Sequence, residues 1–118
     1  MRPDQRDASY LWDMLEAARQ VIGFTRGVTL AEYSQSSMLY LAVERGIQII
    51  GEAANRVSSG FQERHPEIPW RKIVAQRNVL VHEYGDVDPA LIWDLVQEHL
   101  PQLVAQLENL VPPPPQDA

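Results

Sequence analysis

The segment of residues 77–84 contains the side chains best suited to chemistry, namely Arg77, Asn78, His82 and Tyr84. A histidine with a pKa of about 6.5 can accept the proton of a ribose 2′-hydroxyl. An arginine can hold the scissile phosphate and stabilise the charge that develops on it, and Asn78 can orient the imidazole or the phosphate. These residue types supply the parts needed to cleave RNA without a metal ion.

Spacing alone does not separate this chemistry from a structural role, because an arginine five residues before a histidine is a common pair. In the structural alternative, Arg77 pairs with Glu44 or Glu52, and His82 caps the carbonyl groups at a helix end. Arg77 nevertheless lies at the centre of the apolar stripe of its predicted helix. A guanidinium in that position needs a carboxylate, a subunit interface or an anionic ligand, so both alternatives stay open.

The elements that must position these residues are predicted to be helices, because apolar residues recur at helical spacing and no window alternates like a half-buried strand. Thr29 and Glu32 have the spacing of a capping box, which marks the start of a long second helix. Asp88 and Pro89 provide an N-cap and an N1 proline for the last helix, which Pro101 is predicted to kink. The predicted helices cover residues 7–26, 29–58, 69–83 and 88–110.

The composition fits one all-α domain. The chain has 118 residues, of which 45% are hydrophobic, so one compact core over residues 1–110 is expected. The proline-rich segment 111–118 is expected to be an extended, disordered tail. Because the sequence has no cysteine, disulfides, thiolate metal sites and a cysteine nucleophile are excluded.

The formal net charge of −6 argues against broad attraction to nucleic acid, so any contact with a polynucleotide must be local. No stretch approaches the roughly 18 apolar residues that a membrane span requires. We expect a cytoplasmic protein that makes no membrane contact. His65 and His99 lack a second ligand at the spacing of a helical zinc site, so we predict no metal and no cofactor.

The long second helix carries apolar residues on two opposite faces. One stripe suits the core of the domain and comprises Leu39, Tyr40, Val43, Ile47, Ile50, Ala54 and Val57. The second face has Met38, Leu41 and Ile49, with Arg45 and Glu52 between them. This mixture of apolar and charged residues resembles a subunit interface, so a homodimer across this face is predicted. In the alternative, the rest of the chain covers the helix on both sides.

The motif Arg77-Asn78-x-Leu80-x-His82-x-Tyr84 resembles the Arg-x4-His-x-Tyr signature of HepT-like ribonucleases in the HEPN superfamily, the toxins of HepT/MNT toxin–antitoxin pairs. Further similar landmarks, spread over about residues 8–110, are Tyr10-Leu11-x-Asp13-Met14, Glu44-Arg45, Ile50-Gly51-Glu52-Ala53, Ile68-Pro69-Trp70, Val87-Asp88 and Ile92-Trp93. The combination is specific, whereas the short motif alone is not.

The resemblance implies an up-and-down bundle of four to five helices that dimerises and joins two Arg-x4-His motifs in one composite cleft. It also implies that Arg77 and His82 are catalytic and that Asn78 supports them. A cognate MNT nucleotidyltransferase, the antitoxin, would neutralise the enzyme by attaching AMP to Tyr84. RNA is then the substrate, and DNA is not, because the expected nucleophile is the 2′-hydroxyl. The alternative from another class is a noncatalytic adaptor or nucleotide-binding partner of a nucleotidyltransferase.

Overall fold

The computed structural model describes residues 4–82 and 87–112, except for the side chains of Val81 and His82. These ranges contain helices and no strand, so the predicted all-α class is confirmed. The elements are α1 (Gln5–Thr25), α2 (Leu30–Gln35), α3 (Ser37–Arg56), α4 (Ser59–Arg64), α5 (Trp70–His82), α6 (Pro89–Asp94), the π-helical segment η1 (Leu95–His99) and α7 (Leu100–Glu108). None of the described helices combines the length and hydropathy of a membrane span.

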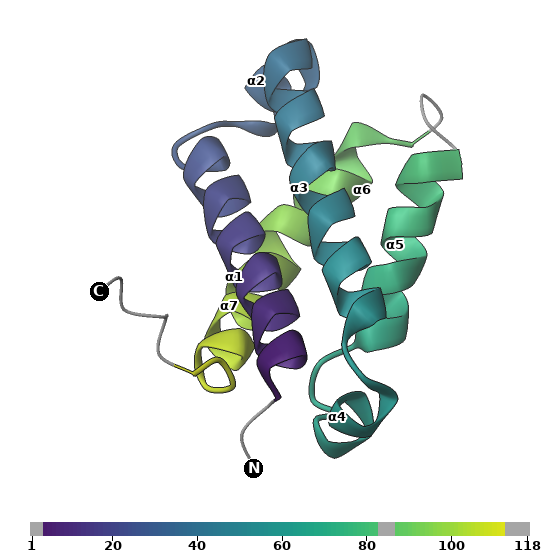
Figure 1. Cartoon of the computed structure of the whole chain (residues 1–118). Helices are drawn as coiled ribbons and strands as arrows, with labels where there is room; N and C mark the ends of the chain where they lie inside the picture. The colour runs from purple at the N-terminus through teal and green to yellow at the C-terminus, as the bar shows by residue number, and fades with distance from the viewer. Residues whose placement is uncertain (1–3, 83–86, 113–118) are drawn as a thin grey trace.

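The helices form an up-and-down bundle around α3 (Figure 1). α3 packs against α1 and α5, and α7 packs against α1. Two glycines of α3 allow these close approaches, because a Cβ atom on Gly46 would overlap Val21 of α1 and one on Gly51 would overlap Arg77 of α5. The absence of a side chain at Gly51 therefore sets how closely α5 lies against α3.

The predicted core stripe of α3 faces the interior. Its fully buried members are Val43, Ile47, Ile50, Ala54 and Val57. Leu39 and Tyr40 are half-buried and pack against the same core. The rest of the core comes mainly from α1 and α7, with Leu11, Leu15 and Leu107 almost inaccessible to solvent.

The long helix that the sequence predicts from Thr29 is interrupted at Ser36. Ser36 is extended, with φ −104° and ψ 101°, and its hydroxyl accepts a hydrogen bond from the Leu39 N–H at 3.2 Å. It therefore caps α3. The predicted capping box of Thr29 and Glu32 is present, but it begins the short α2. A serine side chain competes for backbone hydrogen bonds, and this explains a break that the apolar pattern does not reveal.

A further short helix, α4, was not predicted. Its N-cap Ser58 accepts a hydrogen bond from the Phe61 N–H at 3.3 Å. The Ser58 hydroxyl and N–H both donate to the carboxylate of Asp7, at 2.6 and 2.8 Å. Since Asp7 and Phe61 are buried, these contacts fix α4 to the first turn of α1.

The last predicted helix begins as expected, because Asp88 Oδ1 accepts a hydrogen bond from the Ala90 N–H at 2.9 Å and Pro89 follows the cap. The irregularity predicted at Pro101 is the π-helical segment η1, directly before α7. Proline has no N–H to donate and its ring crowds the preceding turn, so a locally wider helix accommodates it.

The predicted tail is described only at its first two residues. Val111 and Pro112 are half-buried, and the Pro112 carbonyl accepts a hydrogen bond from the indole N–H of Trp12 at 3.1 Å. These two residues lie against α1. Residues 113–118 lie outside the described part of the chain.

Candidate active site

Arg77 lies in the contact between α5 and α3, as its place on the apolar stripe predicts. A Cβ atom on Gly51 would overlap Arg77 Cβ and lie only 2.8 Å from its Cγ, so the stem of the arginine covers the glycine. The guanidinium Nη1 donates a hydrogen bond to Asn78 Oδ1 at 2.8 Å. The Nε atom is buried and has no hydrogen-bond partner among the described residues. The aliphatic part of Arg77 is thus packed against Gly51, and its guanidinium lies beside Asn78.

The ion pairs of the structural alternative are not formed within residues 4–80 and 87–112. Glu52 lies 3.9 Å from Arg45 rather than beside Arg77. Glu44 is buried, and neither of its carboxylate oxygens has a hydrogen-bond partner among the described residues. Since a half-buried guanidinium is costly without an anion, Arg77 is suited to bind one.

Glu44 belongs to a buried polar cluster that the sequence pattern did not reveal. The Tyr33 ring lies 5.6 Å from that of Tyr40 and 5.3 Å from that of Trp93, where α2, α3 and α6 meet. Burial raises the pKa of the Glu44 carboxyl, and the nearby Tyr40 side chain partly offsets this increase. Burial, followed by the charges of Tyr40 and Glu44, also raises the pKa of Tyr33. The helical wheel places Glu44 in the apolar stripe, but only the packing of α2 and α6 shows what covers it.

Replacing Gly51 with alanine is expected to destabilise the protein by roughly 1–3 kcal/mol, because the new methyl group overlaps Arg77 and lies 3.3 Å from the Ile73 carbonyl. The matched control is Gly23→Ala in α1, where no atom lies within 4 Å of the added Cβ. That change should be neutral or stabilise by up to about 1 kcal/mol. Urea denaturation of both variants measures the difference, and equal effects would show that Gly51 does not set the α3–α5 distance.

Gly51 of α3 and Arg77 of α5 lie where the two antiparallel helices touch. Residues at other helical positions therefore fall on one side or the other of this contact line. One side, termed the motif face, carries Leu41, Arg45, Glu52, Asn55 and Arg56 of α3 and Arg71, Val74 and Asn78 of α5. His82 is the last residue of α5, four positions after Asn78, so its position also belongs to this side. Tyr84 lies outside the described residues.

The predicted dimer interface lies on this same motif face. Met38 is 82% exposed and Leu41 is 49% exposed, which is unusual for large apolar side chains, while Ile49 is half-buried. Arg45 and Glu52 lie between them, 3.9 Å apart. The described residues therefore leave Met38 and Leu41 exposed, on the side of the α3–α5 pair to which the Arg-x4-His motif belongs.

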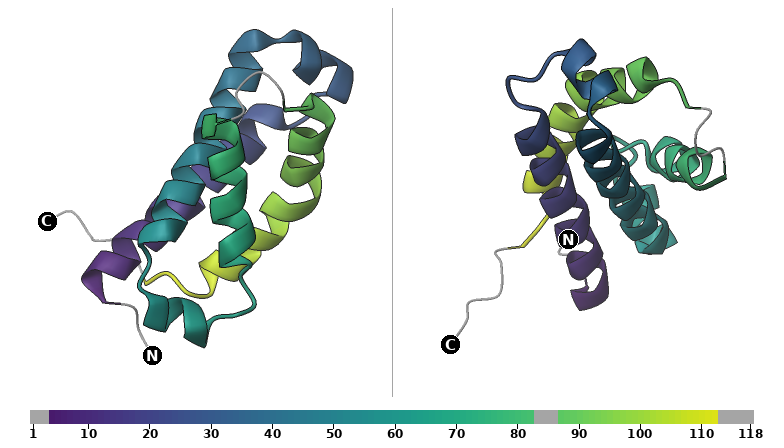
Figure 2. Two further views of the ribbon diagram at one scale, coloured as in Figure 1. Left: turned by 90° about the vertical axis from the view of Figure 1, so that its right-hand side faces the viewer. Right: turned by 90° about the horizontal axis from the view of Figure 1, so that it is seen from above.

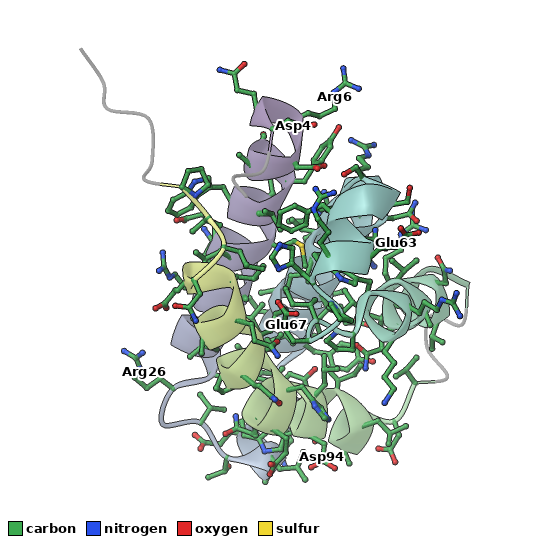
Figure 3. All side chains as sticks on the ribbon, turned by 90° about the horizontal axis from the view of Figure 1, so that it is seen from below. Asp4, Arg6, Arg26, Glu63, Glu67 and Asp94 are labelled. Atoms are coloured by element: carbon green, nitrogen blue, oxygen red, sulfur yellow. The ribbon has the colours of Figure 1, made fainter. Side chains whose placement is uncertain are left out.

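The opposite side of α5 borders a largely apolar groove. Two adjoining cavities of about 370 and 450 Å³ share Ile47, Gln76, Leu95 and His99. The groove runs between α5 and the arm of α6, η1 and α7, which lie beside each other in the left view of Figure 2. Glu67 lies at one end, where its backbone carbonyl accepts a hydrogen bond from Gln106 at 2.9 Å (Figure 3).

The remaining histidines do not join the motif face. His99 lines the groove, and His65 Nδ1 lies 3.2 Å from Glu67 Oε1. The described ranges contain no group of three side chains suited to hold a metal ion. Of the residues singled out in the sequence, the structure brings together Arg77 and Asn78, on the same side of the α3–α5 pair as the exposed apolar residues of α3.

Comparison of the sequence with known proteins identifies its relatives. The family model described as Ribonuclease HepT-like matches residues 14–110. A protein of Methanocaldococcus jannaschii named "Putative RNase" is 37% identical over 100 residues, which cover 85% of this chain and 92% of the relative. "Probable ribonuclease HepT" of Thermococcus cleftensis is 37% identical over 101 residues, covering 86% and 92%. A second M. jannaschii "Putative RNase" is 28% identical over 109 residues, covering 92% and 90%.

No solved structure is significantly similar to the chain. The family assignment therefore comes from the sequence, and the match over residues 14–110 includes α3 and the α5 motif. The resemblance predicted from that motif is confirmed, and with it the class of enzyme, a ribonuclease. The chain belongs to the HepT-like ribonuclease family.

Proposed function

We propose that this protein is a metal-independent endoribonuclease whose active site is a cleft between two copies of the chain. Arg77 and His82 are its catalytic residues, and Asn78 supports them. The observation that carries this proposal is the environment of Arg77. Its stem is packed on Gly51, its guanidinium has no carboxylate partner among the described residues, and Asn78 holds it from the motif face.

The proposed reaction uses the substrate's own nucleophile. The neutral imidazole of His82 accepts the proton of a ribose 2′-hydroxyl, and the 2′-oxygen attacks the adjacent phosphorus. The bond to the 5′-oxygen breaks, and this oxygen takes a proton from the imidazolium of the second copy. The products are a 2′,3′-cyclic phosphate and a 5′-hydroxyl. Arg77 stabilises the negative charge on the phosphate oxygens as the new bond forms.

Incubation of the purified, unmodified protein with matched RNA and DNA strands, both with excess chelator, tests this reaction. RNA should be cut and DNA should remain intact, because only RNA carries the 2′-hydroxyl. Loss of cleavage in chelator would contradict the metal-independent mechanism. Absence of cleavage under all conditions would favour a noncatalytic partner.

The composite site requires a homodimer across the part of the motif face that carries Met38, Leu41 and Ile49. Leu41→Glu should dissociate it, because an isologous interface contains each substitution twice and each buried, unpaired carboxylate costs roughly 1–3 kcal/mol. The dimer Kd should rise about 30-fold to 10⁴-fold, and cleavage should fall as the monomer accumulates. Leu91→Glu is the matched control, since Leu91 is 65% exposed on α6 and borders the groove.

Light scattering coupled to gel filtration measures both variants. A wild-type protein that is monomeric at micromolar concentration, or a fully active monomeric Leu41→Glu variant, would contradict the composite site. Leu41 is preferred to Ile49 for this test because Ile49 is half-buried against the core and its replacement would also affect folding.

We further propose that the protein is the toxin of a toxin–antitoxin pair and that a cognate MNT-type nucleotidyltransferase silences it by AMPylation of Tyr84. The support is the similarity to "Probable ribonuclease HepT" together with the motif that contains Tyr84. Tyr84 follows Arg77 by seven residues in the sequence. A nucleotide attached there would add bulk and about one negative charge close to the arginine.

A further inference from the structure

The positive charge of this acidic protein is concentrated on α5. The chain has a net charge of −6, yet α5 carries Arg71, Lys72 and Arg77 and no acidic residue. Every other described helix contains at least one aspartate or glutamate. Because contact with a polynucleotide depends on local positive charge, α5 is the helix best suited to follow an RNA backbone.

Arg71 and Lys72 are neighbours in sequence but belong to opposite sides of α5. Arg71 precedes Asn78 by seven residues, so helical spacing places both on the motif face. Lys72 instead lines the groove together with Gln76 and His99. Both side chains are exposed, so only the face that they occupy distinguishes them.

Arg56 of α3 is also exposed and lies opposite Arg71. Arg56 follows Gly51 by five residues toward the C-terminal end of α3, while Arg71 precedes Arg77 by six residues toward the start of α5. Since Gly51 contacts Arg77 and the helices are antiparallel, Arg56 and Arg71 lie at a similar level of the motif face. Neither forms an ion pair with a carboxylate of the described residues.

We propose that Arg56 and Arg71 form a subsite for the RNA backbone and bind phosphates next to the one held by Arg77. This inference rests on the proposed function, because it assumes a single strand that lies on the motif face. Arg71 is about 9 Å from Arg77 along the helix axis, from six residues at about 1.5 Å each. A strand anchored at Arg77 and directed toward the start of α5 therefore passes Arg71 and Arg56. These residues bind without base readout, since arginine recognises the phosphate itself.

Binding is tested in the His82→Ala background, so that the substrate remains intact, with a fluorescent single-stranded RNA at several salt concentrations. Each phosphate contact contributes about 0.7 to the slope of log K against log salt for a single strand. Arg56→Ala and Arg71→Ala should each reduce the slope by about 0.7 and weaken binding about fourfold at ~0.15 M salt. The double variant should lose about 1.4 from the slope and about 14-fold in affinity.

Lys72→Ala is the matched control, because it removes the same charge from the neighbouring position and faces the groove. Its slope should remain that of the parent, and Arg71→Lys should retain the slope because the charge is kept. Equal slope changes for Arg71→Ala and Lys72→Ala, or no measurable RNA binding by the parent, would overturn the proposed subsite. A protein that binds RNA with the expected slopes but does not cleave it would instead refute the proposed catalytic function and leave the subsite standing.

Discussion

His82→Ala should lower the rate of RNA cleavage by about 10²- to 10⁴-fold, the usual contribution of a general base. In the proposed mechanism neither of the other two histidines can replace the imidazole. His65 hydrogen-bonds Glu67 at the α4–α5 connection, and His99 lines the groove on the far side of α5. Single-turnover kinetics with saturating RNA measures the chemical step, and circular dichroism checks that helical content is unchanged.

His99→Ala provides the matched control for this prediction. His99 is exposed, lies in η1 and belongs to the groove rather than the motif face, so its loss should leave the cleavage rate unchanged. A His82→Ala variant that is well folded and as active as the wild type would remove His82 from the mechanism. A large effect of His99→Ala would move the candidate site to the groove.

Tyr84→Phe should leave cleavage active but abolish neutralisation when a cognate nucleotidyltransferase and ATP are supplied. The phenylalanine ring keeps the packing volume and removes the oxygen that would accept AMP. In the wild-type protein, the attached phosphodiester should occupy the guanidinium of Arg77 and repel an incoming RNA phosphate. Inhibition should therefore approach completeness in the wild type and be absent in the variant.

Tyr10→Phe is a suitable control, because Tyr10 is half-buried on α1 and lies outside the α3–α5 pair. That variant should be modified and silenced like the wild type. Intact-protein mass spectrometry, followed by peptide mapping, identifies the modified residue. An added nucleotide on a different residue, or silencing of the Tyr84→Phe variant, would show that Tyr84 is not the acceptor.

The sequence predicted the helical elements where local chemistry determines them. The capping box of Thr29 and Glu32 and the Asp88 cap with its proline are present, because each depends on side chains within three residues. The break at Ser36 was missed, since the apolar spacing continues across it. The short α4 was missed for another reason, because its N-cap Ser58 is held by Asp7, which lies 51 residues away in the chain.

In the candidate site, too, the sequence predicted what depends on helical spacing and missed what depends on contacts between helices. Helical spacing alone placed Arg77 on the core-facing stripe and Met38 and Leu41 on a second, exposed face of α3. It could not show that Gly51 receives the stem of Arg77, because this contact depends on how closely two helices approach. Nor could it show that the buried carboxylate of Glu44 has no hydrogen-bond partner among the described residues, and so does not pair with Arg77 as the structural alternative requires.

Mass spectrometry of the products that the purified, unmodified protein forms from a single-stranded RNA in excess chelator tests the proposed cleavage mechanism. A second strand carries 2′-O-methyl groups throughout and serves as the control. RNA should yield fragments ending in a 2′,3′-cyclic phosphate and fragments beginning with a 5′-hydroxyl, and the methylated strand should stay intact. Cleavage of the methylated strand, or fragments that begin with a 5′-phosphate, would contradict attack by the 2′-hydroxyl and with it the roles assigned to His82 and Arg77.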